Sequence, residues 1–175
     1  MSEASWSRRR SIGEGIIGAV SVGLFFVLIG VIFVINHNLW SNIQSFFDNF
    51  TIANVTNTSI QLPVPAVPAA HVVVYSAAFQ FALGIAILQI IVLAIRLMIG
   101  SHVRRTAETV GNLVFWFGAA YFLNGLASME SSLAISKQQE LWFQFWAVII
   151  VLIGVSIVAR AVVLFTARIV RRSRI

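Results

Sequence analysis

Residues 71–105 read HVVVYSAAFQFALGIAILQIIVLAIRLMIGSHVRR, a long apolar run that ends in a basic turn, and this stretch decides the fold. No side chain between Val72 and Ile95 is formally charged. About 20 helical residues, each rising about 1.5 Å, cross a hydrocarbon core about 30 Å thick, so the run is long enough to span a membrane. The arginines that follow mark the end that we expect on the cytoplasmic side, because basic residues accumulate there.

The composition places the whole chain among integral membrane proteins. Hydrophobic residues make up 59% of the 175 residues and charged residues 10%, whereas charged residues are about a quarter of a soluble domain. The net charge of +6 does not indicate nucleic-acid binding, because the basic residues flank apolar segments and do not cover a soluble face. The absence of cysteine excludes disulfides, thiolate metal sites and thiol redox chemistry.

The hydropathy pattern predicts a single membrane domain over residues 1–175 with four spans. They cover about 16–36, 72–95, 110–127 and 141–163, with an outer loop at 37–71. The first apolar run is longer than a signal-peptide core and no small-residue cleavage site follows it, so we expect a retained span. The fourth begins with Trp142 and Trp146, which are typical of the aromatic belt at a membrane interface.

The distribution of basic residues predicts the orientation. Eleven arginines lie on one side and only Lys137 on the other. The arginines are Arg8, Arg9, Arg10, Arg96, Arg104, Arg105, Arg160, Arg168, Arg171, Arg172 and Arg174. Because cytoplasmic segments carry the excess of basic residues, we expect a multi-pass protein of the plasma membrane with both termini in the cytoplasm.

The outer loop contains three features. Apolar residues recur at helical spacing in its first part, which predicts an amphipathic helix on the outer surface; they are Leu39, Ile43, Phe46, Phe47 and Phe50. Because lysine and arginine are absent there, packing over the mouth of the bundle is favoured over binding to anionic lipid. Three prolines, Pro63, Pro65 and Pro68, predict an extended connector. Asn49, Asn54 and Asn57 begin glycosylation sequons, which are either modified or chance matches in an Asn/Thr-rich loop.

Two sets of small residues predict close approach of helices. Gly15, Ala19 and Gly23 lie four residues apart in the first span, and Gly111, Gly118 and Gly125 lie seven apart in the third. Small side chains let helix backbones come together in a membrane, so both sets are candidate packing faces. For the first set the alternative is that glycine is simply common in membrane helices.

The two halves of the chain share a pattern that indicates an internal repeat. Phe79-Gln80-Phe81, Arg96 and Arg104 match Phe143-Gln144-Phe145, Arg160 and Arg168, each shifted by 64 positions. The predicted fold is therefore an all-α membrane bundle of four transmembrane helices, made of two tandem parallel helical hairpins, with the extracytoplasmic amphipathic helix added.

That symmetry predicts a polar ring near the outer leaflet. Gln80 pairs with Gln144 in the repeat, and Asn36 with Asn124. These amides are candidate ligand-binding groups, and the alternative is that they hydrogen-bond between helices or to water.

Little in the sequence indicates catalysis. No span carries an ionisable group near the bilayer centre, where proton relays and ion pathways place one. His37 and His71 are weak candidates for a metal site at the outer surface, since no ligand spacing supports them. No nucleophile motif or phosphate-binding loop is present. We therefore expect neither an enzyme nor a cofactor.

The segments RRRSIGEGIIG, LPVPAVP and RRTAETVGNLVFW give the chain a resemblance to small four-pass archaeal membrane proteins. That resemblance implies the fold and no functional residue. Plentiful small-residue faces favour a non-enzymatic accessory or scaffold subunit of a larger membrane complex, in contact with membrane lipids and with protein partners or further copies of itself. The alternative is a membrane binding or transport module for a lipid or a small neutral solute.

Overall fold

The computed structural model describes residues 3–56 and 58–172, with the backbone alone at 3–14, 16, 17, 171 and 172. The described elements follow one another as α1 (Glu3–Ile35), α2 (Leu39–Asp48), β1 (Phe50–Asn54), β2 (Gln61–Pro65), the 3-10 helix η1 (Pro68–His71), α3 (Val72–Met98), α4 (Val103–Ala127) and α5 (Ile135–Arg172).

Four of the helices are long and apolar enough to cross a membrane, which confirms that prediction. The apolar segments are Gly18–Ile35, Pro68–Met98, Val103–Ala127 and Ile135–Val170. Helix α5 has 38 residues, about 57 Å at 1.5 Å per residue, which exceeds a hydrocarbon core about 30 Å thick. It must therefore continue into the interfacial region on at least one side.

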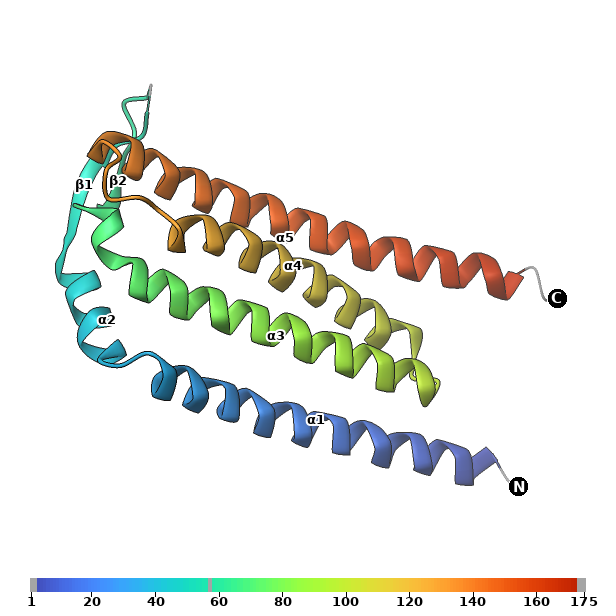
Figure 1. The fold of residues 1–175 in the computed structure, drawn as a ribbon. Helices are drawn as coiled ribbons and strands as arrows, with labels where there is room; N and C mark the ends of the chain where they lie inside the picture. The colour runs from blue at the N-terminus through green and yellow to red at the C-terminus, as the bar shows by residue number, and fades with distance from the viewer. Residues whose placement is uncertain (1–2, 57, 173–175) are drawn as a thin grey trace.

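The four long helices lie side by side in the order α1, α3, α4, α5 (Figure 1). Helix α3 packs most extensively on α4, α4 packs on α5, and α1 contacts chiefly α3. The first and last described residues lie at the same end as the α3–α4 turn, which we call the basic end; α2 and the strands lie at the opposite end, the loop end. Helices α1 and α5 are thus the two edges of the row.

The α3–α4 turn at the basic end is closed by a glycine. Gly100 has φ 62°, a left-handed conformation that glycine adopts without strain. The amide of Ser101 donates to the carbonyl of Arg96 at 2.9 Å, and that of Gly100 to Leu97 at 3.3 Å. This is the Schellman arrangement that ends many helices, and it lets α4 turn back immediately against α3.

The loop end contains a β-hairpin where the sequence predicted an extended proline connector. Strands β1 and β2 pair antiparallel, with Phe50 opposite Pro65 and Asn54 opposite Gln61. Prolines 63 and 65 therefore lie in a strand. A two-stranded sheet has two edges, and proline is tolerated on an edge because its missing N–H can face away from the partner strand.

The principal buried cluster also lies at the loop end and draws one residue each from α2, β2, α3, α4, the α4–α5 loop and α5. Its members are Phe46, Val64, Tyr75, Leu126, Met129 and Trp142. Farther along the row, the buried residues of α3 and α4 are mostly small, including Ala82, Ala86, Ala119 and Ala120. Small residues at the contact let the two backbones come close. The fold thus combines an aromatic cap with a tightly packed α3–α4 pair.

Candidate functional site

An apolar groove of about 730 Å³ lies between α5, α2 and the hairpin at the loop end. We call it the aromatic groove. All of its lining residues are apolar: Phe46, Phe47, Phe50, Val55, Ile60, Leu62, Pro63, Trp142, Phe143, Trp146, Ala147 and Ile150. Its volume lies within the range of about 300–1,000 Å³ typical of small-molecule sites.

One wall of the groove is a stripe along α5. Phe143, Trp146, Ala147 and Ile150 are spaced i, i+3, i+4 and i+7, so they project from one face of the helix. Trp146 is 50% exposed and Ile150 is 70% exposed. The wall from Phe143 to Ile150 extends about 10 Å at 1.5 Å per residue, so the groove continues from the loop end along the membrane-spanning helix.

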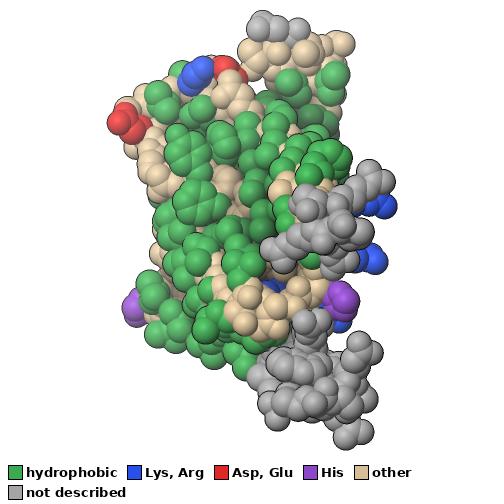
Figure 2. Space-filling model, turned by 90° about the vertical axis from the view of Figure 1, so that its right-hand side faces the viewer, with side chains coloured by type: hydrophobic (Ala, Val, Ile, Leu, Met, Phe, Trp, Pro, Cys, Tyr) green, Lys and Arg blue, Asp and Glu red, His purple; other side chains and the backbone are tan. Residues whose placement is uncertain are grey.

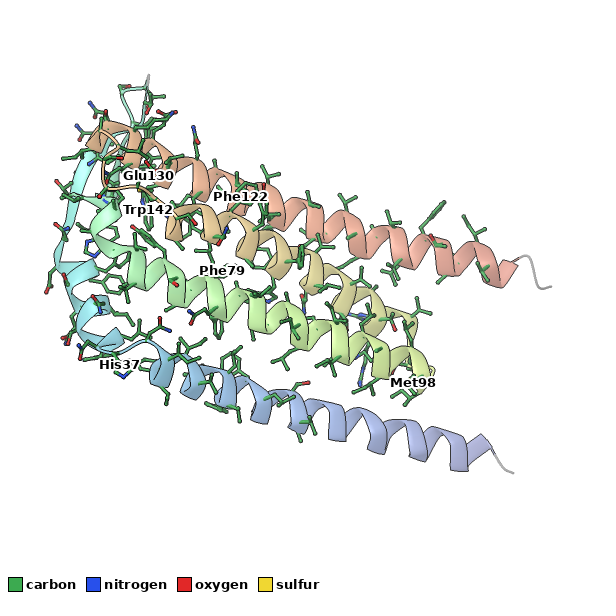
Figure 3. The ribbon with its side chains drawn as sticks, viewed as in Figure 1. His37, Phe79, Met98, Phe122, Glu130 and Trp142 are labelled. Atoms are coloured by element: carbon green, nitrogen blue, oxygen red, sulfur yellow. The ribbon has the colours of Figure 1, made fainter. Side chains whose placement is uncertain are left out.

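The floor of the groove is a set of interlocked aromatic rings. Trp142 is 6% exposed, and its ring centroid lies 5.9 Å from that of Phe46, 6.1 Å from Phe50 and 6.0 Å from Tyr75. Figure 3 shows Trp142 near the start of α5. Edge-to-face aromatic pairs stabilise by about 0.5–1.5 kcal/mol beyond their burial, so the floor is preformed.

The hairpin forms the opposite wall. The amide of Val55 donates to the carbonyl of Ile60 at 2.8 Å, which closes the hairpin beyond its paired strands. Ile60 is 58% exposed and Leu62 is 44% exposed, although both are apolar. Among the described residues, those that line the groove carry no charged or hydrophilic side chain. The groove can therefore hold an apolar group by dispersion and desolvation, and its own side chains offer no acid, base or nucleophile.

The four amides of the predicted polar ring do not share one environment. Asn36 donates through Nδ2 to Gln80 Oε1 at 2.8 Å and to the carbonyl of Ile32 at 2.9 Å. Gln144 instead donates to Glu140 on its own helix at 2.9 Å, in an exposed position. Asn124 is exposed near the end of α4. The single ring was wrong because α1 and α5 are opposite edges of the row, so their amides cannot meet.

The two candidate histidines also lie in different surroundings. His71 is 5% exposed; its Nε2 lies 2.9 Å from Asn49 Nδ2, and its ring packs on Phe46. His37 is exposed at the α1–α2 junction (Figure 3). Among the side chains that the structure describes, no three from His, Cys, Asp or Glu gather closely enough to hold a metal ion.

The glycosylation sequons differ in how accessible their asparagines are. The amide of Asn49 is engaged with His71 in a half-buried position, so a glycan there would require that contact to open. Asn54 is exposed on β1. Asn57 lies outside the described residues.

The two small-residue sets have different neighbours. A methyl group added at Gly111 would lie 2.3 Å from Arg160 Nε, and one at Gly118 would lie 2.4 Å from Leu152 Cδ2, so these two glycines face α5. A methyl group at Gly125 would meet nothing within 4 Å. On α1, the same is true of Gly15 and Gly23, and Ala19 is exposed.

Two of the arginines that predict the orientation, Arg96 and Arg160, point toward α4, one from α3 and the other from α5. Arg96 of α3 donates to Thr109 Oγ1 and to the carbonyl of Arg105. Arg160 of α5 donates to Asn112 Oδ1 at 2.7 Å. The positions of Arg96 and Arg160 predict interfacial charges only. The sequence signal for their contacts is the pair of polar side chains, Thr109 and Asn112, which lie one turn apart in an apolar helix. Arg104, Arg105 and Arg168 are exposed, and the side chains of Arg8, Arg9 and Arg10 lie outside the described ones.

The aromatic groove itself was not predicted. The sequence predicts Trp142 and Trp146 as residues of the interfacial belt, and it predicts an extended proline connector where the hairpin forms the second wall. The sequence signal for the groove is the set of apolar and aromatic residues spaced i, i+3, i+4 and i+7 on α5, together with the alternating apolar residues of the hairpin segment.

Fold and composition define a helical integral membrane protein with four potential spans and an apolar groove at one end. Comparison of the chain with protein-family models, with curated proteins and with solved structures gives no significant match.

Proposed function

We propose that this chain is a non-enzymatic integral membrane protein that binds the apolar chain of a lipid-like molecule in the aromatic groove. The observation that carries the proposal is the groove itself, which measures about 730 Å³ and whose described lining residues are all apolar. Its α5 wall belongs to a segment long enough to cross a membrane, so a chain can enter from the bilayer without passing through water.

The rigidity of the groove supports binding over passing contact with bulk lipid. Phe46 and Trp142 are almost fully buried in the floor, and each packs edge-to-face on further aromatic rings. A preformed apolar slot spares the ordering of its own side chains when an occupant binds. An alkyl or isoprenoid chain fits this lining best, because it has no polar group that the groove would leave without a partner.

The test fills the groove from its α5 wall. Ala147 lines the groove and is exposed, so Ala147→Trp adds bulk inside it without disturbing the core. Ala161→Trp is the matched control, since Ala161 is exposed on α5 outside the groove lining. Binding of radiolabelled palmitate to the purified full chain in mild detergent is the measurement. We expect Ala147→Trp to weaken binding about tenfold, a change equivalent to about 1.4 kcal/mol, and Ala161→Trp to leave it unchanged. Equal binding by both variants would contradict the proposal.

A second candidate function, an accessory or scaffold subunit of a larger complex, is favoured by the outward face of α1. The methyl groups that substitution would add at Gly15 and Gly23 meet nothing within 4 Å. The face of α1 that contacts α3 is a different one and includes Leu28, which abuts Gly84. A small-residue stripe turned away from α3 can accept a helix of a protein partner or of a second copy.

This second candidate has its own test. Gly23→Leu adds bulk to the stripe, and Val31→Leu, at an exposed position of α1 off the stripe, serves as the control. The measurement is purification from native membranes in mild detergent followed by mass spectrometry of the proteins that remain bound. We expect Gly23→Leu to lose partners that the wild-type chain and Val31→Leu retain; a wild-type chain that purifies alone as a monomer would exclude this function.

We further propose the orientation and origin of the fold. The concentration of arginine at the basic end supports a plasma-membrane protein whose termini are cytoplasmic and whose helix α2 lies at the outer surface. The 64-residue shift that relates Phe79-Gln80-Phe81, Arg96 and Arg104 to Phe143-Gln144-Phe145, Arg160 and Arg168 supports a tandem duplication of a two-helix hairpin, α1–α3 and α4–α5.

A further inference from the structure

We propose a second, independent binding site at the basic end of the molecule, where a pocket takes the phosphate group of an anionic phospholipid. The pocket measures about 290 Å³ and lies between the first turn of α4 and the last turns of α5. It is lined by His102, Val103, Arg104, Leu164, Ala167 and Arg168. This volume suits a lipid headgroup better than a whole lipid. The inference does not rest on the aromatic groove, which is at the other end of the molecule.

The charge of the lining selects an anion. Arg104 comes from α4 and Arg168 from α5, so two guanidinium groups border one pocket. The Nε of Arg104 lies 3.4 Å from Glu108 in an exposed pair, which is a weak interaction in water. Among the described residues no carboxylate pairs with Arg168. Figure 2, which looks onto this end, shows Lys or Arg side chains at the right beside a histidine, and another at the upper left beside the visible carboxylates.

The start of α4 adds backbone donors to the same pocket. The amides of Arg105 and Thr106 donate to the carbonyl of His102, whereas His102 makes no side-chain cap and the first turn of α4 contains no acidic residue. Among the described residues, no side chain therefore caps the backbone N–H groups of Val103 and Arg104. The partial positive charge of a helix N-terminus then acts together with the two arginines on a phosphate.

The remaining lining indicates an amphiphilic ligand. Leu164 and Ala167 lie within one helical turn of Arg168 on α5, so the α5 wall of the pocket changes from cationic to apolar over a single turn. Phe165, adjacent to this wall, is 67% exposed and continues the apolar surface of the spanning helix. A phosphodiester bound at Arg168 could therefore leave its acyl chains along α5, an arrangement that a free phosphate does not use. Basic pockets between membrane helices bind anionic headgroups in this way.

The experiment compares variants of equal charge. The purified full chain in mild detergent is titrated with phosphatidylglycerol, with zwitterionic phosphatidylcholine and with inorganic phosphate, and bound ligand is counted by native mass spectrometry. Arg104→Gln and Arg168→Gln each remove one guanidinium from the pocket. Arg105→Gln is the control, because Arg105 is exposed in the same turn of α4 but is not part of the lining. Thermal unfolding of each variant verifies that it is folded.

We expect wild type to prefer phosphatidylglycerol to phosphatidylcholine, and each pocket variant to weaken phosphatidylglycerol binding about tenfold, because each removes a charge-assisted hydrogen bond. The control should change it less than about twofold, since it loses only surface attraction that salt screens. Competition by inorganic phosphate at similar concentration would keep the phosphate site and assign it to a free anion. Equal weakening by Arg105→Gln, or no preference between the two lipids, would overturn the proposal.

Discussion

At the scale of single residues, the hydrogen bond between Asn36 and Gln80 joins α1 to α3. The bond is 2.8 Å long and partly buried, and Asn36 follows directly after α1. Other contacts beside it are apolar, such as the edge-to-face pair of Phe25 and Phe81. The amide pair therefore fixes the register of an edge helix that has packing on one side only.

We predict that removing this link destabilises the protein measurably but modestly. Asn36→Leu and Gln80→Leu should each lower the free energy of unfolding by about 1 kcal/mol, and the double variant should show a coupling of about 0.6 kcal/mol, the size typical of interhelical hydrogen bonds in membranes. Unfolding in mixed micelles titrated with SDS measures all three. Strictly additive single effects would show that the two amides do not interact.

Trp142 is one of the buried aromatic residues of the loop-end cluster. Its ring contacts those of Phe46, Phe50 and Tyr75. We predict that Trp142→Ala lowers the free energy of unfolding by about 3 kcal/mol, because it leaves a cavity among buried aromatic rings. Trp40→Ala is the control, since Trp40 is 62% exposed; its effect should stay below about 0.5 kcal/mol. The same SDS titration compares them, and similar losses in the two variants would contradict the assigned core.

At the scale of helices, α4 and α5 pack closely where a glycine of α4 leaves room for a large side chain of α5. Gly111 lies under Arg160, whose Cγ would be 2.4 Å from an added methyl group. Arg160 Cγ is close to its own backbone, so this side chain cannot avoid the methyl group by moving its tip alone. Gly125, on the same helix, faces open space.

We therefore predict different effects for the same substitution at these two glycines. Gly111→Ala should destabilise the protein by about 1–3 kcal/mol, the usual cost of overpacking, and should displace Arg160 from Asn112. Gly125→Ala should change stability by less than about 0.5 kcal/mol. Thermal unfolding in detergent measures both. If Gly111→Ala is as stable as Gly125→Ala, the packing of α5 on α4 differs from that described.

At the scale of the whole molecule, the absence of native cysteine permits a direct test of orientation. Met98 at the basic end is 87% exposed, and Ser131 in the α4–α5 loop is also exposed. In intact cells, a membrane-impermeant maleimide should label Ser131→Cys at once and Met98→Cys only after permeabilisation, because arginine-rich segments are retained in the cytoplasm. The reverse pattern would invert the proposed topology.

The elements differ in how far the sequence could predict them. Long apolar runs need no partner to be recognised, because every backbone group in a bilayer must be bonded within its own helix; four helices long and apolar enough to span were therefore predictable. The β-hairpin was not, because its two strands are short, contain proline and are held by pairing across the sequence. The Asn36–Gln80 contact combined two residues that were singled out correctly, but their predicted partners Asn124 and Gln144 depended on an arrangement of helices that sequence symmetry alone does not fix.

The sequence by itself determined that this is a helical membrane protein with its arginines concentrated at one end, because hydrophobic length and charge are local properties of the chain. Only the tertiary structure decided the order α1, α3, α4, α5 and the groove that α5 shares with the hairpin. The physical reason is that all four helices are apolar around most of their surface, so hydrophobicity cannot specify which faces meet. That choice depends on a few small residues, two inward-turned arginines and the aromatic cluster at the loop end.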